Sequence, residues 1–137
     1  MAIVLLDTSV ASLLLPQSAA RPERVLYEPH MVGNTLALSF QSIAELWKLA
    51  EKRRWAARRC GELEAFVRRF LVIPYDYELA RVGARVCVEA EAQGRPFETG
   101  DAWIAATAVH RRLTLLAHDS DFKDRSVSGL TLLCFLP

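Results

Sequence analysis

Short apolar runs alternate along this chain with longer segments in which apolar residues recur at helical spacing. Apolar runs without alternation are typical of strands that are buried on both faces of a parallel sheet. Parallel strands need crossover connections, which are usually helical. The pattern therefore predicts an α/β fold, a three-layer sandwich with a mostly parallel central sheet. The predicted strands span residues 3–6, 35–40, 71–73, 113–117 and 130–136.

The segments between these runs carry the end signals of helices. After the first strand, Asp7-Thr8-Ser9 offers side-chain oxygens that can cap a helix, and Pro16 stops that helix near Leu15. The most apolar helix is buried all round, because nearly every side of it is apolar, and Thr99 is expected to cap it. Another predicted helix begins after Pro22 and ends near residue 31, limited by Pro29 and Gly33. A further helix contains residues 43–50, and two more span residues 55–70 and 77–93.

Length and composition limit the class of protein. The chain has 137 residues, and we expect residues 1–137 to form a single domain. With 52% hydrophobic and 24% charged residues it is not a disordered protein. Its net charge of +1 means that any attraction to nucleic acid or to anionic membrane must come from a local patch.

The compartment is predicted from the cysteines and from the absence of targeting signals. Cys60, Cys87 and Cys134 lack the close spacing of zinc ligands, so we expect buried thiols in a reducing environment. No basic leader precedes the first strand, and no apolar run approaches the about 20 residues that span a bilayer. The sequence predicts a cytoplasmic protein with no membrane role.

Acidic residues gather at the edge where open parallel sheets bind ligands, the carboxyl ends of the strands. Asp7 ends the first strand, and Glu45 lies in the first turns of the helix after the second. Asp101 opens the buried helix, while Asp119 and Asp121 follow the fourth strand. Crowded carboxylates repel one another unless a cation neutralises them, and hard oxygen ligands suit Mg²⁺ or Mn²⁺. Such a site can activate water for attack on a phosphodiester.

Each of these acids also has a structural explanation. Asp7 would cap the first helix, and Asp101 would sit in a first turn because the helix dipole favours an acid there. Glu45 would pair with Lys48 or Lys52 on a solvated helix face, and the acids after the fourth strand would be loop residues. Independent structural roles do not require all of them to share one edge, so their convergence favours a metal site.

A basic cluster follows Glu45 along the chain, with Trp47 and Trp55 interleaved. It consists of Lys48, Lys52, Arg53, Arg54, Arg58 and Arg59. Such a cluster can contact RNA phosphates while aromatic rings stack bases. The alternative is a solvated helix face with both tryptophans in the core, and for Trp47, which lies on the apolar stripe of its helix, this alternative is favoured.

Four segments of the chain read LLDTS from Leu5, SIAEL from Ser42, DAWIAATA from Asp101 and HDSDF from His118. In this order they resemble the signature motifs of PIN-domain ribonucleases, and most closely those of the VapC-type toxins of bacterial type II toxin–antitoxin pairs. The resemblance spans Ile3 to Leu136 and implies a PIN-like fold.

The resemblance also implies a function and a set of site residues. It implies a Mg²⁺-dependent endoribonuclease that hydrolyses RNA with metal-activated water, Mn²⁺ being a possible substitute, and a homodimer whose site a small antitoxin blocks. The implied catalytic and metal-binding acids are Asp7, Glu45, Asp101 and Asp119. Asp121 is a further metal ligand, because the family varies at this segment and either acid can be the nearer one. Thr8 or Ser9 is implied as a supporting hydroxyl.

Two other functions fit the same strand-end acids. The first is that of a phosphotransfer protein, either a phosphatase or a receiver domain. A haloacid-dehalogenase-like phosphatase needs a second acid two residues after the first, where this chain has Ser9. A phospho-accepting receiver needs an Asp at the end of a central strand and a late Lys, and the Ile73-Pro74-Tyr75 segment offers neither clearly. The second alternative is a PIN-like module that binds RNA or protein without catalysis, against which the intact acids count.

Overall fold

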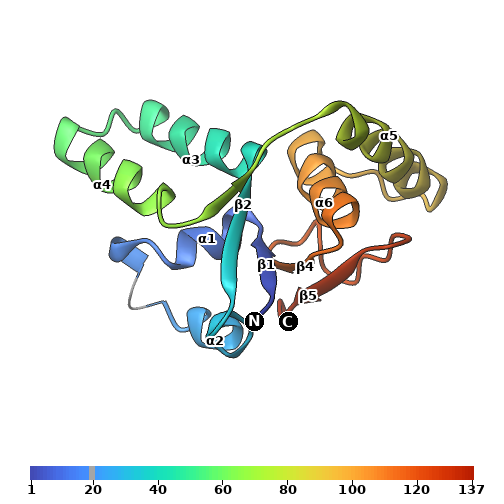
Figure 1. The fold of residues 1–137 in the computed structure, drawn as a ribbon, viewed down its shortest axis with the longest axis horizontal. Helices are drawn as coiled ribbons and strands as arrows, with labels where there is room; N and C mark the ends of the chain where they lie inside the picture. The colour runs from blue at the N-terminus through green and yellow to red at the C-terminus, as the bar shows by residue number, and fades with distance from the viewer. Residues whose placement is uncertain (19–20) are drawn as a thin grey trace.

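The computed structural model describes residues 1–18 and 21–137, and these form a five-stranded sheet with helices on both faces (Figure 1). All neighbouring strands are parallel, in the order β3-β2-β1-β4-β5. The predicted α/β sandwich is therefore confirmed, and the sheet is parallel throughout. The strands are β1 (Ile3–Leu6), β2 (Thr35–Ser39), β3 (Leu71–Ile73), β4 (Thr114–Ala117) and β5 (Thr131–Cys134).

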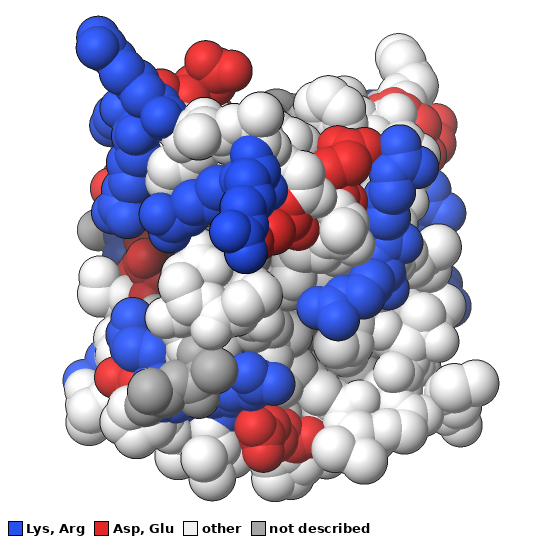
Figure 2. All heavy atoms as spheres, turned by 90° about the vertical axis from the view of Figure 1, so that its left-hand side faces the viewer, with Lys and Arg blue, Asp and Glu red and all other residues white. Residues whose placement is uncertain are grey.

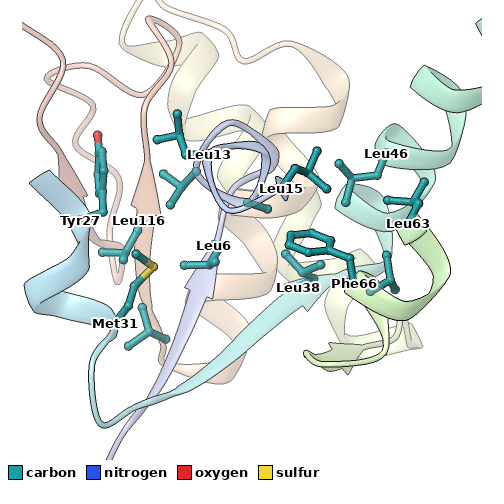
Figure 3. Packing of buried hydrophobic residues seen from close by; sticks show 14 of the residues in the cluster. Leu6, Leu13, Leu15, Tyr27, Met31, Leu38, Leu46, Leu63, Phe66 and Leu116 are labelled. Carbon is teal, nitrogen blue, oxygen red and sulfur yellow. The ribbon is translucent and has the colours of Figure 1, made fainter. Parts of the chain in front are cut away.

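Two groups of helices cover the two faces of the sheet, and alternating side chains of β1 show how. Leu6 packs into the core shared with α1 to α4, whereas its neighbour Leu5 packs against α5 and α6. Figure 3 shows the first of these cores, with Leu6 and Leu38 from the sheet and Leu46 and Phe66 from the helices. The helices are α1 (Thr8–Leu13), α2 (Arg24–Met31), α3 (Phe40–Lys52), α4 (Ala57–Val67), α5 (Tyr77–Ala92) and α6 (Thr99–Arg111), with a 3-10 turn η1 (Pro16–Ser18).

The helix predicted to be buried all round is α6. Ala102 and the run from Ile104 to Ala108 are almost completely excluded from solvent. The prediction is confirmed for the helix but wrong for its cap. Thr99 is already helical, and Glu98 occupies the capping position without a side-chain hydrogen bond.

Several predicted boundaries differ from the observed ones. The second strand stops at Ser39 and not at Phe40, since the Ser39 hydroxyl accepts a hydrogen bond from the Ser42 backbone N–H (3.1 Å) and so begins α3. The first helix ends at Leu13, short of Leu15. Pro29 lies inside α2. Four of the predicted segments are also longer than the observed elements, at residues 55–70, 77–93, 113–117 and 130–136.

The cysteines differ from expectation in their burial. Cys60, Cys87 and Cys134 are unpaired, as expected, but each is partly exposed rather than buried. Among the helices of the described chain, none has the length and apolar character needed to cross a membrane.

Candidate functional site

The carboxyl ends of β1, β2 and β4 meet at one edge of the sheet (Figure 1). Leu6, the last residue of β1, is in register with Leu38 of β2 and Leu116 of β4. The residues that follow these strands therefore emerge side by side. Because α1 and α3 start here, and the loop after β4 crosses the same edge, side chains from distant parts of the sequence come together.

Asp7 is the most buried acid of this edge, with 3% of its surface exposed. Its Oδ2 accepts hydrogen bonds from the Ser9 hydroxyl (2.5 Å) and the Ser9 backbone N–H (3.3 Å), so Asp7 does cap α1. Burial raises the pKa of the Asp7 carboxyl to about 6, although these hydrogen bonds act to lower the pKa, and the nearby charge of Glu45 adds to the rise. The cap and the site are therefore two roles of one residue.

Ser9 joins two strand ends. While its hydroxyl donates to Asp7, the same oxygen accepts the backbone N–H of His118 at 2.9 Å. It thereby fixes the chain after β4 relative to the chain after β1. The supporting role in catalysis that the family resemblance implied for this hydroxyl stays a prediction.

Glu45 reaches the same edge from the second turn of α3. Its Oε1 accepts a hydrogen bond from the Thr8 hydroxyl (3.1 Å), and its Oε2 accepts one from the Gln41 side-chain amide (3.2 Å). The alternative ion pairs with Lys48 or Lys52 do not occur in the part of the chain that the structure describes. Glu45 is thus directed to the site and not to a solvated helix face.

The Ser42 hydroxyl and the Tyr75 phenol, to which the sequence assigned no role, complete this side of the site. The Thr8 hydroxyl lies 3.0 Å from that of Ser42, and the Tyr75 phenol donates to the Gln41 side-chain carbonyl at 3.2 Å. Burial raises the pKa of Tyr75 to about 12, with the charge of Glu45 adding to it, so the phenol keeps its proton. Ser42 begins the SIAEL segment, whereas a single tyrosine such as Tyr75 carries no sequence signal of such a role.

Asp101 lies half-buried in the first turn of α6. Burial is the largest cause that raises its pKa to about 8, followed by a hydrogen bond shared with Asp121 and by the charges of Asp7 and Asp119. These four carboxyl groups therefore act on one another. Their negative charge is not fully compensated by protein groups, which is the condition that a bound cation relieves.

Asp119 and Asp121 differ in how their oxygens are used. Both Asp121 oxygens are engaged, Oδ1 by the Arg125 guanidinium at 2.7 Å and Oδ2 by the Glu98 backbone N–H at 3.1 Å. Asp119 uses Oδ1 to accept the Asp121 backbone N–H at 2.8 Å. Among the described residues, its Oδ2 has no hydrogen-bond donor.

Arg125 was not predicted from the sequence, although it organises the loop after β4. Its side chain is fully buried, lies 3.8 Å above the Phe97 ring and also donates to the Asp121 backbone carbonyl at 3.1 Å. Arg95 donates to the backbone carbonyls of Ser120 (2.8 Å) and Lys123 (2.6 Å) in the same loop. The spacing of four residues between an acid and an arginine is too common to have indicated this contact.

The chemistry of the site suits a hard divalent cation, because every charged candidate ligand is a carboxylate. Within residues 1–18 and 21–137, however, no three Asp, Glu, His or Cys side chains lie close enough together to form a ready metal-binding group. The acids converge on one edge and repel one another there, but a complete coordination shell is not preformed. Their assignment as metal ligands stays a prediction.

The basic cluster occupies the C-terminal half of α3, the turn that follows it and the first turn of α4, whereas Glu45 lies nearer the start of α3. Arg53, Arg54, Arg58 and Arg59 line an open hollow near η1. Figure 2 shows basic side chains interspersed with acidic ones on this side of the molecule. Arg58 pairs with Glu62 (3.6 Å), and Arg59 lies 4.0 Å above the Trp55 ring.

The two tryptophans beside this cluster are partly buried. Trp47 and Trp55 both pack against the core formed with α1 to α4, as the alternative to base stacking predicted. Lys48 and Lys52 are exposed. Whether the cluster contacts RNA stays a prediction.

A polar, acid-rich site at the carboxyl edge of a parallel sheet defines an α/β protein of the kind that binds ligands beyond its strand ends. The strand order 3-2-1-4-5 differs from the 2-1-3-4-5 order of receiver domains, which removes that alternative. The model of the PIN domain family matches residues 4–127, and the chain belongs to this family.

Individual relatives agree with the family. Ribonuclease VapC5 of Mycobacterium tuberculosis is 29% identical over 117 residues, which are 85% of this chain and 83% of the relative. The tRNA(fMet)-specific endonuclease VapC of Shigella flexneri is 28% identical over 126 residues, 92% of each. A chain of VapBC2 from Rickettsia felis, solved bound to a promoter DNA fragment, has a TM-score of 0.79 at 22% identity and 98% coverage of both chains. The resemblance to VapC-type PIN-domain proteins is therefore confirmed.

Proposed function

We propose that this protein is a Mg²⁺-dependent endoribonuclease and the toxin of a toxin–antitoxin pair, formed by a single PIN-like domain over residues 1–137. One observation carries the proposal: in a chain of the PIN family, Asp7, Glu45 and Asp101 meet at one sheet edge with Asp119 and Asp121 and act on one another electrostatically. Nuclease activity is supported by the names of the curated relatives.

The proposed cation site draws on residues from four segments of the chain. Asp7, Glu45, Asp101 and either Asp119 or Asp121 would hold Mg²⁺, or Mn²⁺ in its place. When bound, this ion would supply an activated water and stabilise the leaving oxygen of an RNA phosphodiester.

The surrounding residues orient these acids. Ser9 holds the Asp7 carboxylate through its hydroxyl, and Thr8 holds that of Glu45. Arg125 fixes Asp121. Side chains that already face the site need less reorganisation when an ion and a substrate bind, so these contacts contribute to catalysis without touching the substrate.

The substrate class and the partners are inferred from relatives. Since the relatives are named as ribonucleases and, in one case, as a tRNA-specific endonuclease, we infer RNA as the substrate class. The similar VapBC complexes support a cognate antitoxin as the protein partner. The homodimer and the cytoplasmic location stay predictions from the sequence.

The decisive experiment compares wild type with Asp101→Asn on labelled RNA, with Mg²⁺ and with chelator. Asn keeps the shape of the side chain but removes a charged ligand, so we expect wild type to cleave only with Mg²⁺ and the variant to lose most activity. Circular dichroism and thermal melts check that the variant is folded. Full activity of the folded variant, or equal cleavage in chelator, would overturn the proposal.

The alternative of a module without catalysis is separated by the same samples. Such a module would bind RNA equally with and without Mg²⁺ and leave it intact in every reaction. A phosphatase would release phosphate from a small phosphomonoester and leave the internal bonds of RNA uncut.

A further inference from the structure

Three aromatic side chains lie beside the acidic edge. The ring centroids of Phe40 and Tyr75 are 5.4 Å apart, and those of Tyr75 and Trp103 are 5.7 Å apart. None of the three belongs to either hydrophobic core of the described chain. Phe40 is 54% exposed and Tyr75 is 39% exposed. Adjacent exposed aromatic rings form an apolar patch, which on a protein surface often marks a binding site.

The sheet register places this patch at the carboxyl edge. Ser39, the last residue of β2, is in register with Ile73, the last residue of β3. Phe40 follows Ser39 directly, and Tyr75 follows Ile73 after Pro74, so the two rings emerge near each other. The same edge carries the acidic residues that follow β1 and β4.

Trp103 forms the inner part of the patch. It lies on α6, two residues beyond Asp101. A side chain at Gly83 of α5 would collide with its indole ring, so the absence of one there lets the indole pack directly against α5. The ring is thus held in place beside Tyr75, and Phe40 and Tyr75 present the exposed surface.

Hydrogen bonds connect the patch to the acids. The Tyr75 phenol donates to Gln41, and Gln41 donates through its amide nitrogen to Glu45, each over 3.2 Å. A Cβ at Gly100 would lie 2.9 Å from this amide nitrogen and 3.2 Å from a Glu45 carboxylate oxygen, so the start of α6 packs closely against both side chains. A group resting on the patch is therefore next to whatever is bound at the acidic edge.

We propose that Phe40 and Tyr75 form a stacking platform for one unpaired base of single-stranded RNA whose backbone passes the acidic edge. This inference rests on the proposed function. Aromatic rings stack any base, whereas a base within a duplex does not present its face. The acidic edge by itself repels phosphates, so an uncharged contact beside it is an effective way to retain a strand there.

The test measures binding separately from cleavage. Fluorescence anisotropy in chelator, where the proposed enzyme does not cut, gives the affinity for a labelled single-stranded RNA, for the same RNA in a duplex, and for an oligonucleotide of the same length with abasic positions. We expect Phe40→Leu and Tyr75→Leu to weaken single-strand binding roughly 5- to 150-fold, the range that one stacked base contributes. Binding of the abasic strand should not change.

Matched variants identify the cause. Tyr75→Phe keeps the ring and loses only the hydrogen bond to Gln41, so it should retain most of the binding. Tyr77→Leu removes a neighbouring aromatic side chain that is 77% exposed and outside the patch, and it should bind like wild type. Steady-state cleavage with Mg²⁺ should show the loss in Phe40→Leu mainly as a higher KM.

Several results would overturn the platform. One is unchanged affinity in both leucine variants, and another is equal loss for the abasic strand. A third is a change from dimer to monomer in light scattering with RNA affinity unaltered, which would make the patch an interface between copies. A wild type that stacks RNA but never cleaves it would sink the proposed function alone, whereas active leucine variants with unchanged KM would sink the platform alone.

Discussion

Asp7 and Asp121 lie at the same edge of the sheet, but neighbours of different charge hold them. Asp7 is fixed by the neutral hydroxyl of Ser9, whereas Asp121 is fixed by the guanidinium of the fully buried Arg125. The negative charge of Asp7 therefore has no cationic side chain beside it among the described residues, whereas that of Asp121 is paired with Arg125. The difference indicates that acids close together in space need not share a role: one suits an ion, and the other suits holding a loop.

The largest expected effect separates these two roles. Asp7→Asn should reduce cleavage by about 1,000-fold, since a bound ion contributes several kcal/mol to the transition state and each about 1.4 kcal/mol is tenfold. Asp121→Asn should retain much more activity. Single-turnover cleavage of one RNA by both folded variants measures the difference. Equal losses would break the comparison and make Asp121 a ligand.

The contact between Asp121 and Arg125 should matter more for stability than the contact between Asp7 and Ser9. Arg125→Gln leaves the Asp121 charge without its partner and removes a donor from the backbone carbonyls of Asp121 and Arg95, so the unfolding free energy should fall by about 3–5 kcal/mol. Urea denaturation measures it. Ser9→Ala, which removes neutral hydrogen bonds, is the matched variant and should cost about 1 kcal/mol. A loss below about 1 kcal/mol in Arg125→Gln would contradict a structural role for this ion pair.

Because no cationic side chain in the described part of the chain forms an ion pair with Asp7 or Asp101, the stability of the metal-free protein should depend on pH. Folding raises the pKa of Asp7 to about 6 and that of Asp101 to about 8, so the folded state binds these protons more tightly than the unfolded state. Their contribution to stability is therefore lost as pH rises from about 4 to about 8. Thermal melts in chelator should show this fall, and it should be smaller in Asp101→Asn.

Added Mg²⁺ should reverse this loss, because a cation that binds only the folded state raises its stability. At pH 8 we expect the melting temperature to rise by about 2–8 °C, the shift that roughly 1 kcal/mol produces. At pH 5 the rise should be smaller, since protons occupy the same oxygens. Identical melts with saturating metal and with chelator at pH 8 would show that the carboxylates do not share an ion.

The smallest expected effect is on RNA affinity and concerns the basic cluster. Arg53 and Arg54 have no ion-pair partner among the described residues, whereas Arg58 pairs with Glu62. If the cluster contacts phosphates, Arg53→Gln with Arg54→Gln should weaken RNA binding and reduce the log–log salt slope by roughly 0.7 for each contact. Arg58→Gln should change the slope less. Metal affinity should stay constant, and an unchanged slope in all variants would identify the cluster as a solvated surface.

The amino-acid sequence by itself determined the class of fold and the membership of the acidic edge. Continuous apolar runs such as Ile3–Leu6 require burial on both faces, and helical spacing between them leaves a parallel α/β sheet as the consistent solution. Because parallel strands end at a common edge, the sequence alone places Asp7, Glu45 and Asp119, which follow β1, β2 and β4, at one edge of the sheet.

Only the tertiary structure decided how each acid is held and what lies beside it. The hydroxyl of Ser9 bridges to His118 across 109 positions, and the ring of Tyr75 meets Phe40 through the register of β2 and β3. Contacts between residues so far apart leave no periodicity or spacing in the chain. They depend on strand register and side-chain rotamers, which packing of the whole core fixes, and so Arg125 and the aromatic patch could not be read from the sequence.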